Sequence, residues 1–295
     1  MIKNLVISAR PRQWYKNLVV FAGIVFSFNL FDISMLLKTV LAFAIFCAIS
    51  SSVYIFNDIH DREKDRKHPK KKDRPIASGR LGVRLAGSFG TLLLVAALLI
   101  SFYALNTLFF AIVLAYFVLI DLYTYWLKKM AVVDIMAISI GFVLRAIAGV
   151  VAIMVNLSPW LILCTLLLAM FLAFGKRKHE MIILGKKSAS HRSSLDLYST
   201  EMVDNFITIS ASLIIMSYSL YTFLASSIWM MLTIPFVIFA VLKYMQLLNL
   251  SVLGEETEMM FKNPAMVINI ALWLIVSVLI LYDVPSVLLQ RLLMF

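Results

Sequence analysis

The amino-acid sequence predicts an all-α membrane protein with about nine transmembrane helices in one bundle. Hydrophobic residues make up 62% of the 295 residues and charged residues only 15%, and the mean hydropathy is +0.93. A soluble domain of this size needs more polar side chains to keep its surface in contact with water. The apolar residues also fall into long runs, many of which reach the roughly 20 residues that a helix needs to cross a bilayer.

Nine such runs follow one another along the chain, and polar or charged segments separate them. The first follows a basic start, and the second ends where a highly charged segment begins. The runs lie at residues 13–31, 35–56, 85–104, 107–126, 132–155, 159–175, 202–226, 228–248 and 265–282. No internal repeat or low-complexity linker divides the chain, so we expect residues 1–295 to form a single integral membrane domain.

The basic residues predict how this domain is oriented. Of the 27 lysines and arginines, Lys38 and Arg291 fall on one side of the predicted bundle, and Arg145 and Lys243 lie within helices. The other 23 lie on the opposite side, and basic residues in short loops are retained in the cytoplasm. We therefore expect a multi-pass protein of the inner (cytoplasmic) membrane with a cytoplasmic N-terminus.

The longer connections, at residues 57–84, 176–201 and 249–264, are then cytoplasmic loops, and the active site should face the cytoplasm. The net charge of +11 follows mostly from this topology. It would also attract anionic lipids and phosphorylated substrates, whereas nucleic-acid binding is not needed to explain it.

Residues 57–80 (NDIHDREKDRKHPKKKDRPIASGR) hold an acidic cluster followed by a basic run. If the second helix continues into this segment, Asp58, Asp61 and Asp65 lie within roughly 60° of one another on one face. Magnesium takes one or two protein carboxylates and completes its shell with water and phosphate oxygens. We therefore predict that these three aspartates are catalytic residues that bind Mg²⁺ and, through it, a phosphorylated substrate. Asn57 beside them is predicted to bind the substrate.

Basic residues lie among and after the aspartates, and we predict that they bind the remaining phosphate charge: Arg62, Lys64, Arg66 and Arg74. The alternative is a solvated loop in which opposite charges pair, as Asp58 and Arg62 would at i, i+4, for a few tenths of a kcal/mol. The regular spacing of the aspartates, at the end of a membrane helix, favours the metal site.

Further candidates lie where the fourth predicted helix ends and the fifth begins. Tyr125 and Lys128 would share the membrane depth of the acidic cluster, although a lysine there is often only an anchor. Asp134 and Arg145 lie inside the fifth run. An ionisable residue in a membrane helix costs at least about 2.5 kcal/mol on insertion scales, so it should face a polar cavity or a partner. We predict substrate binding for both, with a structural ion pair as the alternative.

The third cytoplasmic loop begins GKRKHE at residues 175–180. Lys176, Arg177 and Glu180 would lie on successive turns of a helix that leaves the membrane. The two cations are suited to a phosphate or a phosphorylated sugar, and the alternative is again a positively charged anchor.

At the start of the chain, Lys16 and Asn17 lie where the first helix enters the bilayer. Tryptophan and basic residues at this depth commonly form an interfacial belt. The polar stripe made by Gln13 and Asn17 at i, i+4 exceeds what an anchor needs, so we predict a role in substrate binding.

The aspartate motif and the RPIASG at residues 74–79 resemble the NDxxDxxxD motif and following segment of the UbiA superfamily of intramembrane prenyltransferases. The resemblance covers essentially the whole chain and implies the nine-helix fold of that superfamily. RPRQWYKN at 10–17, GFVLRAIAG at 141–149 and GKRKHE at 175–180 are similar to a branch of phosphoribosyltransferases that act on polyprenyl phosphates. Aromatic prenyltransferases of the superfamily carry a second acidic motif of the DxxxD type between helices 6 and 7. Residues 176–205 here offer only Glu180, Asp196, Glu201 and Asp204, and no two aspartates have that spacing.

This resemblance implies Mg²⁺-dependent transfer of a 5-phosphoribosyl group from phosphoribosyl diphosphate to a decaprenyl-type polyprenyl phosphate, with release of diphosphate. The alternative enzyme moves a polyprenyl group from its diphosphate to an aromatic or other acceptor. The third hypothesis is that the protein is a transporter or channel. The gathering of charge at the cytoplasmic ends, with little polarity in the outer halves of the helices, argues against a path through the membrane.

Overall fold

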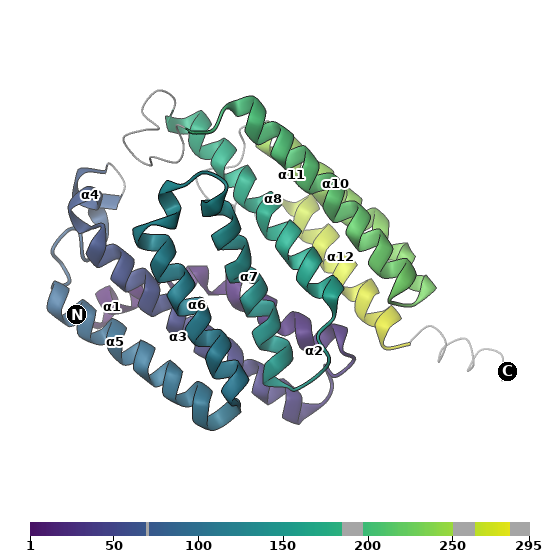
Figure 1. The fold of residues 1–295 in the computed structure, drawn as a ribbon, viewed down its shortest axis with the longest axis horizontal. Helices are drawn as coiled ribbons and strands as arrows, with labels where there is room; N and C mark the ends of the chain where they lie inside the picture. The colour runs from purple at the N-terminus through teal and green to yellow at the C-terminus, as the bar shows by residue number, and fades with distance from the viewer. Residues whose placement is uncertain (69–70, 185–196, 250–262, 284–295) are drawn as a thin grey trace. The chain divides into compact units, whose positions relative to one another are not determined.

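The computed structural model describes residues 1–68, 71–184, 197–249 and 263–283 (Figure 1). Every regular element within those ranges is a helix, which confirms the predicted all-α class. The chain divides into two compact units. Unit 1 comprises Met1–Trp126 and Gly141–Leu157, and unit 2 comprises Leu127–Ile140 and Ser158–Phe295. The single integral membrane domain and its cytoplasmic loops remain predictions, and the third loop, at 249–264, falls almost entirely outside the described residues.

Unit 1 is built mainly from α3, α5 and α6, with shorter helices at their ends. Its complete elements are α1 (Ile2–Ala9), η1 (Pro11–Phe21), α2 (Ala22–Phe26), α3 (Ile33–His60), α4 (Arg62–Lys67), η2 (Lys71–Asp73), α5 (Val83–Ile100), η3 (Ser101–Leu105) and α6 (Thr107–Tyr125).

The boundary between the units falls within α7 (Val133–Ala152). The remaining elements belong to unit 2. They are η4 (Leu127–Lys129), α8 (Pro159–Leu184), α10 (Thr200–Leu224), η7 (Ile228–Thr233), α11 (Ile234–Asn249) and α12 (Pro264–Leu281).

Eight helices in the described ranges are long and apolar enough to cross a membrane, and they match the second to ninth predicted runs in order. The first run, at 13–31, folds differently. It forms the 3₁₀ helix η1 and the five-residue α2, and Phe28 then takes a positive φ of 63°. Its polar residues are used for packing, since Asn17 bonds to side chains of α3. A span here, the count of nine and the cytoplasmic N-terminus therefore remain predictions.

Two glycines bring the N-terminal segment of unit 1 against α7. A Cβ on Gly149 would lie 1.9 Å from the carbonyl oxygen of Val20, and a Cβ on Gly23 would lie 2.8 Å from the amide nitrogen of Val150. Small residues permit such backbone approach between membrane helices. Because Gly149 is one turn after Arg145, this contact brings η1 to the level of that arginine.

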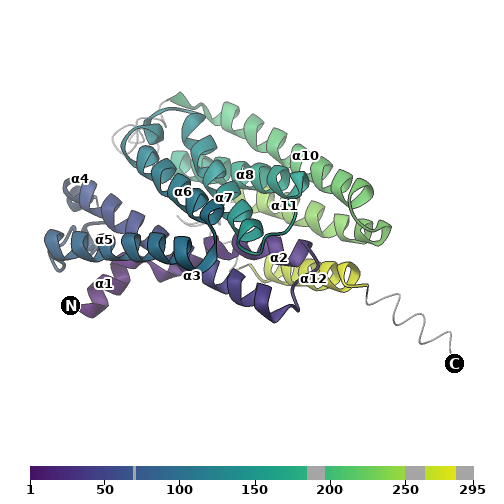
Figure 2. The same cartoon turned by 60° about the horizontal axis from the view of Figure 1, so that its bottom comes forward.

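In unit 2, α8 and α10 lie side by side in both ribbon views (Figures 1 and 2). The core beside them includes Phe171 and Tyr244, whose ring centroids are 5.0 Å apart. A Cβ on Gly175 would lie 2.3 Å from the Tyr244 hydroxyl. Glycine at this position therefore lets α11 pack against α8 immediately before the predicted basic site at 176–177.

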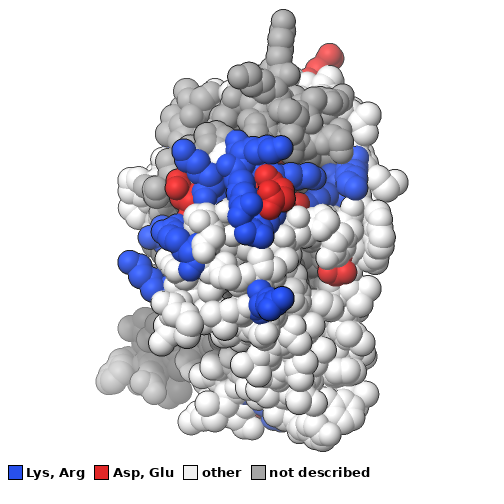
Figure 3. Space-filling view, turned by 90° about the vertical axis from the view of Figure 1, so that its left-hand side faces the viewer, with Lys and Arg blue, Asp and Glu red and all other residues white. Residues whose placement is uncertain are grey.

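Charged side chains gather in one part of the molecular face shown in Figure 3, and the surface below them is mostly uncharged. The exposed basic residues of α4 and of the segment that follows it contribute to the basic surface of unit 1: Lys64, Arg66, Lys67, Lys71, Lys72 and Arg80. This basic surface belongs to the same segment as the predicted aspartate motif.

Candidate active site

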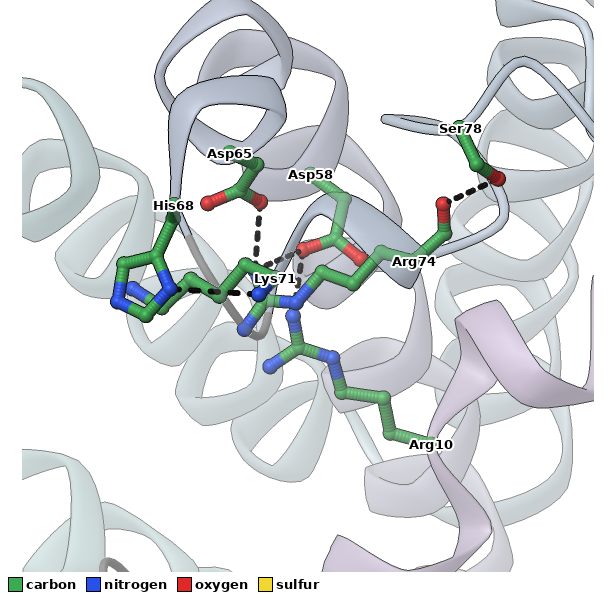
Figure 4. A network of polar contacts seen from close by, with 7 residues as sticks. All are labelled: Arg10, Asp58, Asp65, His68, Lys71, Arg74 and Ser78. Atoms are coloured by element: carbon green, nitrogen blue, oxygen red, sulfur yellow. Dashed lines mark hydrogen bonds and ion pairs between the residues drawn. The ribbon is translucent and has the colours of Figure 1, made fainter.

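Two aspartates of the predicted motif meet two arginines in unit 1 (Figure 4). Asp58, near the end of α3, accepts hydrogen bonds on Oδ1 from Nη2 of Arg10 and, at 3.1 Å, from Nη1 of Arg74. The same Nη1 donates to Oδ2 of Asp65 on α4 at 2.7 Å. Both carboxylates are buried, with side chains 3% and 5% exposed, and therefore depend on the arginines for charge compensation.

Local sequence explains why the aspartates converge. Helix α3 continues to His60, as the sequence interpretation required, and Asp61 is the residue between α3 and α4. Its amide donates to the Asn57 carbonyl, and its own carbonyl accepts from the amide of Asp65. This nearly continuous helical path puts Asp58 and Asp65 on one side.

The RPIASG segment returns Arg74 to that side. Ile76 is fully buried in a small core with Ile55 of α3, and Nε of Arg66 donates to the Ala77 carbonyl at 3.0 Å. Gly79 closes the turn with a φ of 78°, a conformation that glycine adopts without strain. The packing of residues 74–79 thus holds Arg74 beside Asp58 and Asp65.

Arg10 also contacts Asp58, although the sequence did not lead us to predict it as a site residue. It lies between α1 and η1 with a φ of 51°, and its guanidinium carbon lies 4.9 Å from the centroid of the Tyr54 ring. Its backbone is held close to α3, because Ser51 donates to the Ala9 carbonyl at 2.9 Å. The position of Arg10 in RPRQWYKN was the available signal, but only the fold shows that this segment returns to α3.

The donor set fits a divalent cation. Asp58 and Asp65 already direct carboxylate oxygens at one positively charged atom, Nη1 of Arg74. Two carboxylates are as many as Mg²⁺ usually takes from a protein when phosphate oxygens complete its shell. Within the described ranges, no three His, Cys, Asp or Glu side chains form a metal-binding group. Asp61, which is partly exposed, therefore stays a predicted ligand only.

The neighbouring residue of the predicted phosphate site is Arg62, the first residue of α4. Its Nε is buried and has no hydrogen-bond partner in the described part of the chain. The alternative pairing of Asp58 with Arg62 is not what the structure shows, because Asp58 bonds to Arg10 and Arg74.

Arg145 forms a second polar cluster in unit 1. Its guanidinium donates to Oδ1 of Asn17 at 2.8 Å, to the Tyr116 hydroxyl at 2.5 Å and to the Gly141 carbonyl at 3.1 Å. Asn17 in turn donates to Ser50 at 3.2 Å. Arg145 is 5% exposed, and no ion pair of it is found among the described residues. Neutral groups thus hold this buried cation in a membrane helix, and its predicted role in substrate binding stays a prediction.

We expect Arg145→Lys to lower the stability of the protein by roughly 1 to 3 kcal/mol, because one ammonium cannot bond Asn17, Tyr116 and Gly141 together. Thermal unfolding in detergent measures the change. The matched control is Arg84→Lys, at an exposed position near the start of α5. If Arg145→Lys unfolds at the wild-type temperature, a positive charge at this position is sufficient for stability without the three hydrogen bonds.

Two other predicted residues of unit 1 lie within η1 and at the end of α6. Nζ of Lys16 donates to Oε1 of Gln13 at 2.5 Å, so part of the predicted polar stripe is internally bonded. The ring of Tyr125 packs edge-on against His60 with centroids 4.6 Å apart, which links the ends of α6 and α3. Lys128 belongs to η4, in unit 2.

Unit 2 holds a buried ionic cluster around Arg177. Its Nε donates to Oδ2 of Asp134 at 3.0 Å and its Nη1 to Oε2 of Glu180 at 2.7 Å. Arg177 and Asp134 are 1% and 0% exposed, whereas Lys176 is exposed. Helix α8 reaches Leu184, so the predicted helical continuation through 176–180 is confirmed. The structural ion pair considered for Asp134 is present.

Tyr198 completes this cluster, and sequence reasoning did not find it. Its hydroxyl donates to Oδ1 of Asp134 at 3.0 Å and accepts from the Val132 amide at 2.5 Å. Burial raises the pKa of Tyr198 to about 12, so the hydroxyl keeps its proton at neutral pH and remains a donor. No motif marks this tyrosine, since only the fold brings it to the start of α7.

Comparison of the sequence with models of protein families shows the family to which this chain belongs. The model described as the UbiA prenyltransferase family matches residues 17–275. The chain belongs to the UbiA prenyltransferase family. Members of this family are transferases, so the UbiA chain is an enzyme of that class. The eight apolar helices among its described residues make it a multi-span membrane protein.

Three curated relatives of this UbiA protein carry the name decaprenyl-phosphate phosphoribosyltransferase. The one from Mycolicibacterium smegmatis is 35% identical over 93% of this chain and 91% of its own length. Those from Corynebacterium glutamicum and Mycobacterium tuberculosis are 32% and 31% identical over 97% and 93% of this chain, and over 87% and 93% of their own lengths.

Solved UbiA structures share the fold. A UbiA homolog from Archaeoglobus fulgidus, bound to DMAPP and Mg²⁺, matches with a TM-score of 0.73 over 94% of this chain and 99% of that chain, at 17% identity. A structure of digeranylgeranylglyceryl phosphate synthase matches with a TM-score of 0.67 over 96% and 99%, at 20% identity. At these identities the likeness concerns the fold alone.

Proposed function

We propose that this UbiA protein transfers a 5-phosphoribosyl group from phosphoribosyl diphosphate to a decaprenyl-type polyprenyl phosphate, in a reaction that requires Mg²⁺ and releases diphosphate. The site faces the cytoplasm from the inner membrane. The observation that carries the proposal is the likeness, over more than nine tenths of the chain, to relatives named for this activity.

The reaction exchanges one bond to C1 of the ribose for another. The bond from C1 to the diphosphate oxygen breaks, and the diphosphate leaves with the electron pair. A new bond forms from C1 to an ionised phosphate oxygen of the lipid, so no proton has to move. The barrier is lowered when the leaving group's charge is neutralised as it develops.

The acidic cluster of unit 1 is suited to holding the diphosphate. Asp58 and Asp65, with Asp61 between them in the chain, would hold the magnesium ion, which when bound neutralises the leaving diphosphate. Arg74, placed between the two buried carboxylates, and Arg62, whose Nε is unpaired in the described structure, donate to phosphate oxygens. Asn57 is proposed to orient the same group.

The other predicted residues divide into binding and positioning roles. Lys176 is exposed, and together with Lys128 it is proposed to bind the 5-phosphate. In unit 2, Arg177 bonds to both Asp134 and Glu180, and these three residues are proposed to position this basic segment. Four residues of unit 1 complete the proposed substrate site: Lys16, Asn17, Tyr125 and Arg145.

Prenyl transfer is the second candidate, and the name of the matching family favours it. In that reaction a polyprenyl diphosphate would supply the leaving diphosphate, and an aromatic or other acceptor would take the prenyl group. The same two aspartates and Arg74 would serve, so the acidic cluster does not distinguish the two donors.

Purified protein given phosphoribosyl diphosphate labelled in the ribose, polyprenyl phosphate and Mg²⁺ is expected to produce a labelled lipid. A parallel reaction with labelled polyprenyl diphosphate and an aromatic acceptor should give no product. The proposal fails if the first reaction leaves the lipid unlabelled while the second forms a labelled, prenylated acceptor. Chelation of the cation is expected to stop the first reaction.

A further inference from the structure

The ion pairs that the described residues form around Asp58 contain equal numbers of positive and negative charges. The ion pairs join two aspartates, Asp58 and Asp65, to two arginines, Arg10 and Arg74. Adding a divalent cation to these carboxylates leaves the two arginines as excess positive charge in a largely buried environment, which is unfavourable. A diphosphate removes this excess. Cation and diphosphate should therefore bind this cluster cooperatively.

Arg10 is the arginine placed to change partners. Its side chain is 25% exposed, and it reaches Asp58 from 48 residues earlier in the chain. The backbone on either side of it is fixed on α3, because Trp14 donates to Ser51 at 3.0 Å and Ser51 to the Ala9 carbonyl at 2.9 Å. The guanidinium can therefore rotate away from Asp58 while its backbone stays in place.

We propose that Arg10 is a diphosphate-binding residue that exchanges ligands. It covers Asp58 in the ligand-free enzyme and donates to a diphosphate oxygen once a divalent cation occupies Asp58 and Asp65. The proposal rests on the proposed function only in treating the acidic cluster as the diphosphate site. Arg10 thereby couples cation binding to diphosphate binding, and such coupling is reciprocal.

The test measures two affinities of the full-length protein without turnover. Electron paramagnetic resonance of Mn²⁺ reports binding of the cation alone, and calorimetry reports binding of inorganic diphosphate at saturating Mg²⁺. Arg10→Ala is expected to raise the Mn²⁺ affinity several-fold, because a competing cation is lost. It is expected to lower the diphosphate affinity by about tenfold or more, because a charged hydrogen bond is lost.

Two further variants separate this exchange from a structural role. Arg12→Ala removes an equal charge from an exposed position two residues away and should change neither affinity. Arg10→Lys keeps the charge without the fork of donors, so its diphosphate affinity should fall partway while its Mn²⁺ affinity stays at the wild-type value. If both affinities fall together in Arg10→Ala, or if neither changes, the exchange is refuted.

The result is independent of which group the enzyme transfers, because neither probe contains ribose or lipid. If the opposite shifts occur but no labelled lipid forms from phosphoribosyl diphosphate, phosphoribosyl transfer fails and the exchange stands. If labelled lipid forms and both affinities are unaffected by Arg10→Ala, the exchange fails and the proposed function stands.

Discussion

Asp58→Asn is expected to reduce turnover by at least about a hundredfold, the scale seen when one group that stabilises transition-state charge is removed. The substitution keeps the shape of the side chain but removes a negative charge that compensates Arg10 and Arg74. It also removes a predicted cation ligand. Initial rates with saturating donor, acceptor and Mg²⁺ measure the loss.

Asp73→Asn is the matched control, because Asp73 is an exposed carboxylate in the segment that follows α4. It should retain near-wild-type turnover. Size-exclusion chromatography in detergent checks that both variants fold. A well-folded Asp58→Asn protein with near-wild-type turnover would show that the buried ion pairs of the acidic cluster are structural and take no part in the reaction.

Gly149→Ala is expected to have the largest effect on stability, at least about 3 kcal/mol. The added methyl would lie 1.9 Å from the carbonyl oxygen of Val20, and this atom is backbone that no side-chain rotation can move aside. The helices must separate, which also pulls Asn17 away from Arg145. Thermal unfolding in detergent should show a large decrease in the transition temperature.

Gly87→Ala, on α5, is the control, since its Cβ would make an ordinary contact of 3.9 Å with Ile59. Alanine is also the better helix former, so this variant should be as stable as the wild type or slightly more stable. Equal stability of Gly149→Ala and Gly87→Ala would show that η1 does not depend on the close approach to α7.

Hydropathy was sufficient to predict eight of the helices, because a bilayer requires long apolar runs that are visible in sequence. It failed to predict the form of residues 13–31. There the chain contains Gln13, Lys16 and Asn17, and side-chain bonds to α3 and within the segment accompany a 3₁₀ helix. The periodicity of apolar residues in the sequence does not reveal such side-chain hydrogen bonds.

The site was predictable where its residues are close in sequence. Asp58 and Asp65 share one side because the helix continues beyond residue 56, and the 74–79 segment returns to them by local packing. Arg10 bonds to Asp58 across 48 residues, and Tyr198 bonds to Asp134 across 64 residues. The spacing of residues in the sequence cannot reveal contacts over such separations. Likewise, residue type suggested that Arg177 binds phosphate, but its two carboxylate partners became visible only in the fold.

The mass of the lipid product tests the central claim most directly. After incubation with phosphoribosyl diphosphate, polyprenyl phosphate and Mg²⁺, we expect the lipid to gain one phosphoribosyl unit for each diphosphate released, and we expect Asp58→Asn to abolish both signals. Release of diphosphate with an unchanged lipid mass, or addition of a prenyl group to another acceptor in its place, would contradict the account.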